Sequence, residues 1–209
     1  DLSISKIDLK KIILSFKPDV ILHFAGLKAV GESEQKPDLY WKNNVNATLN
    51  ILDCIDKNTD LIFSSSATVY GDSSKQPLTE KSRIQATSVY GETKIASEKL
   101  IKEASTSKGI KAISLRYFNP VGAHKDFVIS EDYLNKPNNL MPKLIESAKK
   151  NLNSIDIYGK DYATRDGTGE RDYIHIQDLV EGHLKAIEKL KAIENIEFYN
   201  LGTGNPISV

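Results

Sequence analysis

The chain has 209 residues, a length that favours one α/β domain or one domain with part of a second. Its 28 Lys and Arg residues balance 28 Asp and Glu residues, and a formal net charge of zero argues against nucleic-acid and anionic membrane partners. Hydrophobic residues make up 40% and charged residues 27% of the chain, which excludes a disordered, collagen-like or coiled-coil protein.

The cysteine and histidine content argues against disulfides and metal sites. The only cysteine, Cys54, cannot form an intramolecular disulfide and leaves too few ligands for structural zinc. The four histidines lack the His-x-x-x-His spacing of a ligand pair, so we expect no metal. No apolar run approaches the roughly 18 residues of a membrane span. These features predict a protein of the reducing cytoplasm.

Helical and strand-like patterns alternate along the first half of the chain. Apolar residues recur at helical spacing, and short apolar runs between the helices lead into polar or glycine-containing segments. The first run, from Val20 to Phe24, is nearly continuous and predicts a parallel strand buried on both faces. The alternation predicts an α/β fold with a doubly wound, Rossmann-type parallel sheet. The predicted elements are helices over residues 9–16, 45–55 and 90–104 and strands over residues 20–24, 61–63 and 112–118.

The pattern loosens after Pro120. A polar, Asn-rich stretch extends to Asn139, and short helices, strands and a Gly-rich loop follow. We expect residues 1–119 to form the Rossmann-type domain and residues 120–209 to combine a smaller α/β binding region with elements that return to the sheet. The Gly-Thr-Gly sequence at residues 202–204 is typical of a turn. The predicted elements are helices over residues 144–148 and 179–187, strands over residues 155–158 and 196–201, and a loop over residues 166–171.

The segments at the ends of three predicted strands are candidates for ligand binding. They cover residues 23–28, 64–71 and 116–122. Ligands of doubly wound sheets bind at the carboxyl ends of the strands, so the three segments would converge on one cleft.

Three side chains near these strand ends form a candidate acid–base site. Tyr90 and Lys94 stand four residues apart in a predicted helix and project from one face. A tyrosine ordinarily has a pKa of about 10, and a neighbouring ammonium would lower it by favouring the phenolate. Ser66 ends a strand and adds a hydroxyl. Each feature alone has a plain structural explanation, because the chain has nine tyrosines and a serine run is a common strand terminus. Their combination predicts a donor, a base and a group that tunes the base.

Six segments carry a resemblance to a known family. They are FAGLKAVGES at residues 24–33, SSSATVYG at 64–71, YGETK at 90–94, YFNP at 117–120, NNLMP at 138–142 and DGTGERDYIH at 166–175. Together they span almost the whole chain in one order. In this content and order the chain resembles the extended short-chain dehydrogenase/reductase family, and within it the enzymes that epimerise nucleotide sugars at C4.

The resemblance implies a role for each matching residue. Tyr90 would be the general base, Lys94 would tune it and hold the nicotinamide ribose, and Ser66 would bind the sugar O4. The implied cofactor is NAD, with contacts from Asp1, Leu2, Phe24, Ala25, Gly26, Leu27, Lys28, Asn43, Tyr90, Lys94, Phe118 and Pro120. The implied substrate is a UDP-hexose, bound by Ser66, Tyr90, Asn119, Asn139, Leu140, Tyr158 and Arg171.

The implied activity is the NAD-dependent interconversion of UDP-glucose and UDP-galactose. It would proceed by oxidation at C4, rotation of a 4-keto sugar and reduction on the opposite face, in a homodimer. The family's first βαβ unit with its glycine-rich phosphate loop is missing, as is the end of its second domain. We therefore expect an internal piece of a longer enzyme, which would not hold NAD or turn over by itself.

Two other functions stay open. A nucleotide-sugar 4,6-dehydratase shares the fold, the cofactor and the Tyr-x-x-x-Lys spacing, but it needs an acid pair where this chain has Ala67 and Thr68, so elimination is disfavoured. A non-catalytic dinucleotide-binding module would keep the sheet without needing Tyr90, Lys94 and Ser66. The presence of all three argues against such a module.

Overall fold

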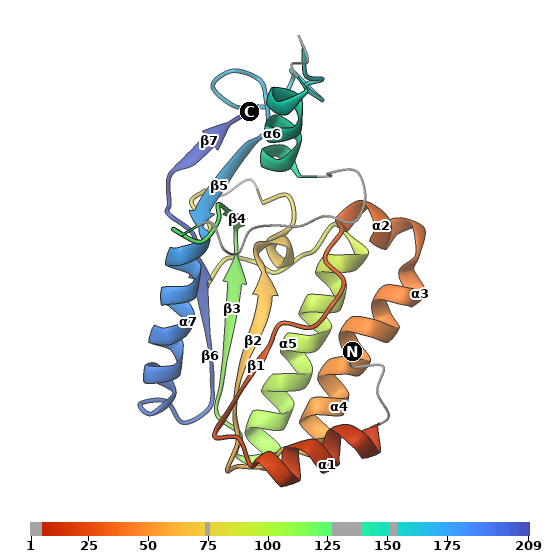
Figure 1. Cartoon of the computed structure of the whole chain (residues 1–209), viewed down its shortest axis with the longest axis vertical. Helices are drawn as coiled ribbons and strands as arrows, with labels where there is room; N and C mark the ends of the chain where they lie inside the picture. Colours follow the sequence, from red (N-terminus) through yellow and green to blue (C-terminus); the bar gives the residue numbers. More distant parts are fainter. Residues whose placement is uncertain (1–5, 74–75, 127–138, 151–153) are drawn as a thin grey trace. The chain divides into compact units, whose positions relative to one another are not determined.

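The computed structural model describes residues 6–73, 76–126, 139–150 and 154–209. The backbone divides into two compact units, each with a sheet of its own (Figure 1). The first unit joins residues 1–118 to residues 182–201, and the second joins residues 119–181 to residues 202–209.

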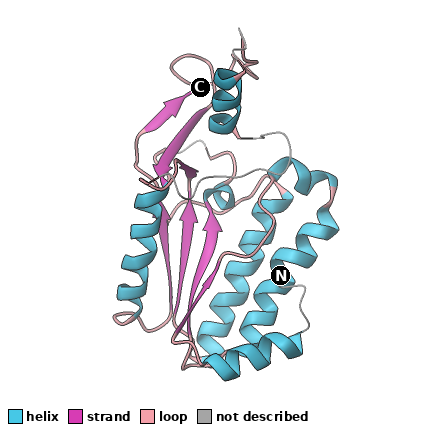
Figure 2. Ribbon diagram, viewed as in Figure 1, coloured by secondary structure: helices cyan, strands magenta, loops and turns pink. Residues whose placement is uncertain are grey.

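A parallel, four-stranded sheet with the order β1-β2-β3-β6 forms the centre of the first unit. The register between β2 and β3 pairs Leu61 with Ala112 and Ser65 with Arg116, so the polar ends of these strands are neighbours. Helices cover both faces of the sheet, which confirms the predicted doubly wound, Rossmann-type fold (Figure 2). The strands are β1 (Val20–His23), β2 (Asp60–Ser66), β3 (Ala112–Tyr117) and β6 (Ile196–Leu201).

Alternate side chains of the strands enter two separate hydrophobic clusters. Leu61 and Phe63 of β2 pack with Ile101 of α5, whereas Ile62 packs with Leu190 of α7. Burial on both faces explains the nearly continuous apolar runs of the central strands. The helices of this unit are α1 (Lys6–Phe16), α2 (Val30–Gln35), α3 (Pro37–Tyr40), α4 (Asn46–Cys54), α5 (Val89–Lys108) and the second part of α7 (Ile176–Leu190).

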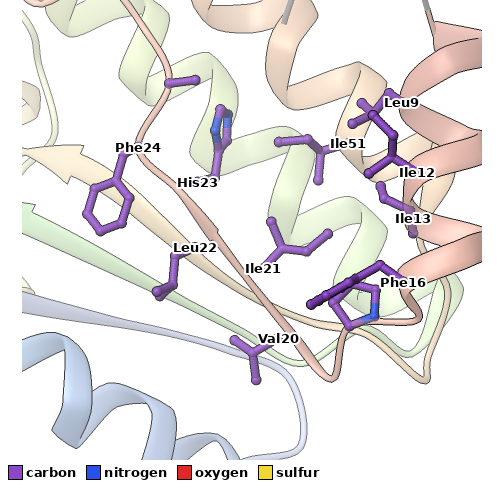
Figure 3. A pocket seen from close by; sticks show the side chains of 12 residues that line it. Leu9, Ile12, Ile13, Phe16, Val20, Ile21, Leu22, His23, Phe24 and Ile51 are labelled. Carbon is purple, nitrogen blue, oxygen red and sulfur yellow. The ribbon is translucent and has the colours of Figure 1, made fainter. Parts of the chain in front are cut away.

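Strand β1 lies at the edge of the sheet, and the prediction that it is buried on both faces is wrong. Among the described strands it pairs only with β2. Leu22 is 41% exposed and Phe24, just after the strand, is 56% exposed. On α1, Ile12 and Phe16 line an apolar hollow of about 410 Å³ together with β1 (Figure 3). The continuous apolar run therefore predicts the strand correctly, but not the cover on its two faces.

Short helical segments account for elements that the sequence did not predict. Helix α2 has six residues and α3 has four, and a π-helical turn over Trp41–Val45 joins α3 to α4. Segments of this length contain too few turns to show a helical periodicity. None of the described helices is long and apolar enough to span a bilayer.

The second unit contains a three-stranded sheet with β5 in the middle. Strand β4 pairs with β5 in parallel, and β7 pairs with it antiparallel. Asp172 accepts hydrogen bonds from the backbone N–H groups of Thr203 and Gly204, each at 2.8 Å, which confirms the predicted turn. Residues 155–158, predicted as a strand, pair with no described strand. A local sequence pattern does not show whether another strand is available for pairing. The elements are β4 (Asn119–Val121), α6 (Leu140–Lys149), β5 (Glu170–His175), the first part of α7 and β7 (Pro206–Ser208).

Truncation of Ile101 tests the cluster beneath α5. Ile101 is 1% exposed, so Ile101→Ala leaves a cavity and is expected to lower the free energy of unfolding by about 2–5 kcal/mol. Leu14→Ala on α1 is the control, because Leu14 is 59% exposed and its truncation is expected to cost less than about 0.5 kcal/mol. Urea unfolding followed by the fluorescence of Trp41, the only tryptophan, measures both changes. Equal losses in the two variants would contradict the assigned core.

Candidate functional site

Strand β2 ends in three consecutive serines, Ser64 to Ser66, and a 3-10 turn over Ala67–Tyr70 follows. The Ser66 hydroxyl oxygen caps this turn. It accepts a hydrogen bond from the Thr68 backbone N–H at 3.2 Å and another from the Thr68 hydroxyl at 3.0 Å. Ser66 is half-buried, so its hydroxyl is fixed at the carboxyl end of the sheet, where the sequence predicts a ligand site.

The first turn of α5 is held against the end of β2. Ser88 caps the helix by accepting a hydrogen bond from the Gly91 N–H at 3.1 Å, and the Tyr90 N–H donates to the Ser33 hydroxyl of α2 at 3.1 Å. A Cβ atom at Gly91 would lie only 3.0 Å from the Thr68 carbonyl oxygen. Glycine therefore allows the close approach that brings Tyr90 to the serine terminus.

The Tyr90 side chain is 9% exposed and lies close to Ser66. Burial raises the pKa of Tyr90, and the nearby Ser66 hydroxyl lowers it in part. In the chain without a cofactor, burial thus disfavours the phenolate more than Ser66 favours it. That Lys94 and a cationic nicotinamide together favour the phenolate stays a prediction.

Lys94 follows Tyr90 by one turn on the same face of α5, as their spacing predicts. Its Nζ atom donates to the Ser64 carbonyl oxygen at 2.6 Å and lies 5.7 Å from the centre of the Tyr90 ring. The side chain is 5% exposed. Burial lowers the pKa of Lys94 to about 8, and the Glu98 carboxylate opposes this shift. The structure thus brings together the predicted set of Ser66, Tyr90 and Lys94.

Residues 24–28, after β1, form the second part of the site. Asn44 holds this loop, because its Oδ1 atom accepts from the Leu27 N–H at 2.8 Å and its Nδ2 atom donates to the Leu27 carbonyl at 3.0 Å. A Cβ atom at Gly26 would lie 3.0 Å from Asn44 Oδ1, so this approach also favours glycine. Asn44 donates as well to the Thr93 hydroxyl at 3.1 Å, which connects the loop to α5.

The asparagine that holds the loop is adjacent to the one that the resemblance singled out. Asn43 is half-buried, and its side chain donates to the Leu39 carbonyl at 3.0 Å. Asn44 is 3% exposed and was missed. The π-helical turn over Trp41–Val45 shifts the phase of the helix here, so the sequence could not distinguish the two neighbours. A cofactor contact from Asn43 stays a prediction.

His23, at the end of β1, is a buried neutral base close to Lys94. It is 3% exposed, its Nε2 atom lies 3.1 Å from the Thr48 hydroxyl, and its Nδ1 atom has no hydrogen-bond partner among the described residues. Burial and the charge of Lys94 lower the pKa of His23 to about 4. Lys94 is therefore the charged member of this pair near neutral pH.

The other predicted site residues lie elsewhere in the chain. Asp1 and Leu2 lie outside the described residues, and Phe118 ends the first unit. Within the part of the chain that the structure describes, no group of three His, Cys, Asp or Glu side chains is placed to hold a metal ion. The residues that belong to the second unit are Asn119, Pro120, Asn139, Leu140, Tyr158 and Arg171.

Two of these residues in the second unit are available to a ligand. Arg171 is exposed on β5, where its Nη1 atom donates to the Glu170 carbonyl at 2.7 Å. Tyr158 is 78% exposed, and Lys143 Nζ of α6 lies 5.8 Å from the centre of its ring. The roles of all six residues stay predictions.

Comparison with known proteins identifies a matching family and several similar proteins. The family model described as "NAD dependent epimerase/dehydratase family" matches residues 1–202. UDP-glucose 4-epimerase 2 of Arabidopsis thaliana is 49% identical over 205 residues, which are 96% of this chain and 59% of that protein. The UDP-glucose 4-epimerase of Yersinia enterocolitica is 48% identical over 205 residues, which are 96% of this chain and 60% of that protein. The chain thus spans less than two thirds of the length of these relatives.

Solved structures of 4-epimerases share the fold. The UDP-glucose 4-epimerase from Brucella ovis in complex with NAD matches with a TM-score of 0.91 and 35% identity, over 97% of this chain and 63% of that one. The enzyme from Bifidobacterium longum in complex with NAD+ and UDP matches with a TM-score of 0.89 and 40% identity, over 98% of this chain and 62% of that one. These findings confirm the resemblance drawn from the six segments.

Replacement of His23 tests whether its imidazole is buried in the neutral form. Between about pH 6.5 and pH 4 the unfolded chain binds a proton at His23 that the folded chain excludes, so stability is expected to fall as the pH is lowered through this window. The titration of His23 is expected to lower the free energy of unfolding by on the order of 3 kcal/mol in total. His23→Gln removes the titration, and its free energy of unfolding is expected to change less between pH 7 and pH 4, as followed by Trp41 fluorescence. Identical pH dependence in both proteins would contradict the neutral assignment.

Proposed function

Because the chain belongs to the NAD-dependent epimerase/dehydratase family, we propose that the protein containing it interconverts UDP-glucose and UDP-galactose with NAD as cofactor. The observation that carries the proposal is the set at the end of β2, where the Tyr90 phenol lies close to Ser66 and the Lys94 ammonium is held by the Ser64 carbonyl. The similarity to UDP-glucose 4-epimerases supports this choice of reaction.

The first unit suits a dinucleotide in two respects. Asn44 fixes a largely exposed loop with glycine at its closest approach, and the ammonium of Lys94 has three N–H donors, of which the Ser64 carbonyl takes one. The other two match the hydroxyls of a ribose. NAD, when bound, supplies a hydride acceptor for C4 and a positive charge beside Tyr90. The proposed contacts are Asp1, Leu2, Phe24, Ala25, Gly26, Leu27, Lys28, Asn43, Tyr90, Lys94, Phe118 and Pro120.

Tyr90 is the proposed general base. Its phenolate takes the proton from the sugar O4 and becomes the phenol, and Ser66, which lies close to Tyr90, binds the same sugar oxygen. Lys94 stabilises the phenolate, because its buried ammonium is fixed beside the ring and cannot be replaced by water. Loss of the O4 proton accompanies oxidation at C4. The resulting 4-keto sugar turns and is reduced on its other face, and Tyr90 returns the proton.

Residues of the second unit are the proposed holders of UDP. Arg171 is exposed, and a guanidinium binds phosphate oxygens through two parallel hydrogen bonds. A sugar that turns needs a firm grip on the nucleotide and little grip on the hexose, so charged anchors belong at the diphosphate. The further proposed contacts are Asn119, Asn139, Leu140 and Tyr158.

The 4,6-dehydratase alternative finds no support at the serine terminus. Ala67 has no acidic group, and the Thr68 hydroxyl donates its hydrogen bond to Ser66 at 3.0 Å. Neither residue can protonate a leaving hydroxyl as a carboxylic acid would. Epimerisation, which removes no hydroxyl, needs no such acid.

The assembly and the compartment are part of the proposal. The resemblance to extended short-chain dehydrogenases favours a homodimer, and the single cysteine suits a reducing cytoplasm. Sedimentation of the complete protein measures the assembly, and imaging of a fluorescent fusion shows the compartment.

The direct test is incubation of the complete protein with UDP-galactose and no added cofactor. Formation of UDP-glucose would support the proposal, since an epimerase keeps and regenerates its NAD. A 4-keto-6-deoxy sugar would identify a dehydratase instead, and unchanged UDP-galactose with bound NAD would identify a non-catalytic module.

Tyr90→Phe removes only the proposed proton acceptor. In the complete protein this change is expected to lower kcat by about 10²–10⁴-fold while NAD stays bound. Tyr199→Phe is the matched control, because the Tyr199 hydroxyl hydrogen-bonds Glu197 two residues earlier and its side chain packs in the cluster under α7. Rates are measured by conversion of UDP-galactose, and NAD is measured in the denatured protein. Full activity of Tyr90→Phe would remove Tyr90 from the mechanism.

A further inference from the structure

Helix α5 carries a third polar residue on the stripe that contains Tyr90 and Lys94. Glu98 lies one turn after Lys94, so the three residues follow one another at four-residue spacing. Glu98 is 4% exposed. Its Oε1 atom accepts a hydrogen bond at 2.7 Å from Ser65, which lies between the two serines that contact Lys94 and Tyr90. All three residues of the serine terminus thus engage the same stripe of α5.

A second strand holds Glu98 from the other side. Arg116 of β3 is 2% exposed and donates to Glu98 Oε1 from Nε at 3.0 Å and to Oε2 from Nη2 at 2.7 Å. Ser114 adds a hydrogen bond to Oε1 at 3.0 Å. Arg116 Nη1 also donates to the Tyr70 hydroxyl at 2.9 Å, and this hydroxyl donates to Asn200 at 2.6 Å. Both charges of the pair are therefore paired and hydrogen-bonded inside the unit.

This arrangement fixes the rotation of α5 on the sheet. The paired hydrogen bonds between guanidinium and carboxylate are directional, and β2 and β3 pair Ser65 with Arg116 in register. If α5 turned by one residue, Glu98 would leave both strands and a buried charge would lose its partners, which is strongly unfavourable. The same rotation would move Tyr90 away from Ser66.

The pair also sets the charge environment of Lys94. The titratable groups that face its ammonium are Tyr90 and Glu98 from its own helix and His23 from β1. His23 is neutral near pH 7 and Tyr90 holds its proton, so the Glu98 carboxylate is the facing negative charge. Arg116 binds this carboxylate from β3.

We propose that Glu98 is a positioning residue of the site: held by Arg116 and by Ser65, it fixes the face of α5 that meets β2 and places a carboxylate one turn from the buried ammonium of Lys94. The inference rests on the proposed function only where it predicts catalysis. The effect of Glu98 on Lys94 does not depend on the proposed activity and can be measured in the chain itself.

The test measures the titration of Lys94 directly. The chain is labelled with ¹³C at the lysine Cε atoms, and the Lys94 signal is assigned by its absence in Lys94→Arg. In Glu98→Gln the midpoint is expected to move down from about 8 by about one pH unit. Glu92→Gln is the control, because Glu92 is two residues from Lys94 but exposed, and it is expected to leave the midpoint unchanged. An unchanged midpoint in folded Glu98→Gln would overturn the proposal, since a purely structural role lowers stability without moving Lys94.

A double variant covers the case in which Glu98→Gln does not fold because Arg116 is left unpaired. Glu98→Gln combined with Arg116→Met removes both charges, so no buried ion is orphaned. The Lys94 midpoint is expected to fall in this variant too, because Glu98 rather than Arg116 is the charge that acts on Lys94. A midpoint that stays at about 8 would overturn the proposal.

Activity of the complete protein separates this inference from the proposed function. If both hold, the alkaline limb of kcat moves down by about one pH unit in Glu98→Gln and stays in place in Glu92→Gln. A shifted Lys94 midpoint without epimerisation by the unsubstituted protein would contradict the function alone. Epimerisation with an unmoved midpoint and an unmoved alkaline limb would contradict the role of Glu98 alone.

Discussion

The packing of α5 against the end of β2 is the contact on which the site depends. Tyr90, Lys94 and Glu98 are buried along one stripe of this helix. Lys94 and Glu98 hydrogen-bond Ser64 and Ser65, and Tyr90 lies close to Ser66. A buried polar group without a partner costs about 1–3 kcal/mol, so the serines and Arg116 make this packing possible. The geometry of the proposed reaction is thus set by the same hydrogen bonds that allow the helix to pack.

Burial acts on Tyr90, Lys94 and His23 in the same sense, toward the neutral form. It raises the pKa of Tyr90 and lowers the pKa values of Lys94 and His23. Only the partners differ. Lys94 has the Glu98 carboxylate one turn away, whereas His23 has an imidazole nitrogen without a described partner. The site therefore keeps one positive charge, at the residue that touches the ring of Tyr90.

The sequence predicts those parts of the structure that depend on neighbouring residues. The alternation of helices and strands follows from local periodicity, and Tyr90 and Lys94 share a face because they are four residues apart on one helix. The cover of a strand, by contrast, depends on distant segments, so the apolar run of β1 could not show that Leu22 is exposed. The contact of Asn44 with Leu27 and the pairing of Arg116 with Glu98 escaped notice for the same reason, because these partners lie 17 and 18 residues away in the chain.

The raised pKa of Tyr90 gives the proposed reaction an order of events. A phenol that burial disfavours as an anion keeps its proton while Lys94 is the only cation beside it. A bound nicotinamide would add a second positive charge that favours the phenolate, and it would supply the hydride acceptor for C4. O4 is then deprotonated only when oxidation at C4 can follow. In the proposed reaction, the burial that keeps Tyr90 protonated in the chain alone would thereby couple proton transfer to oxidation.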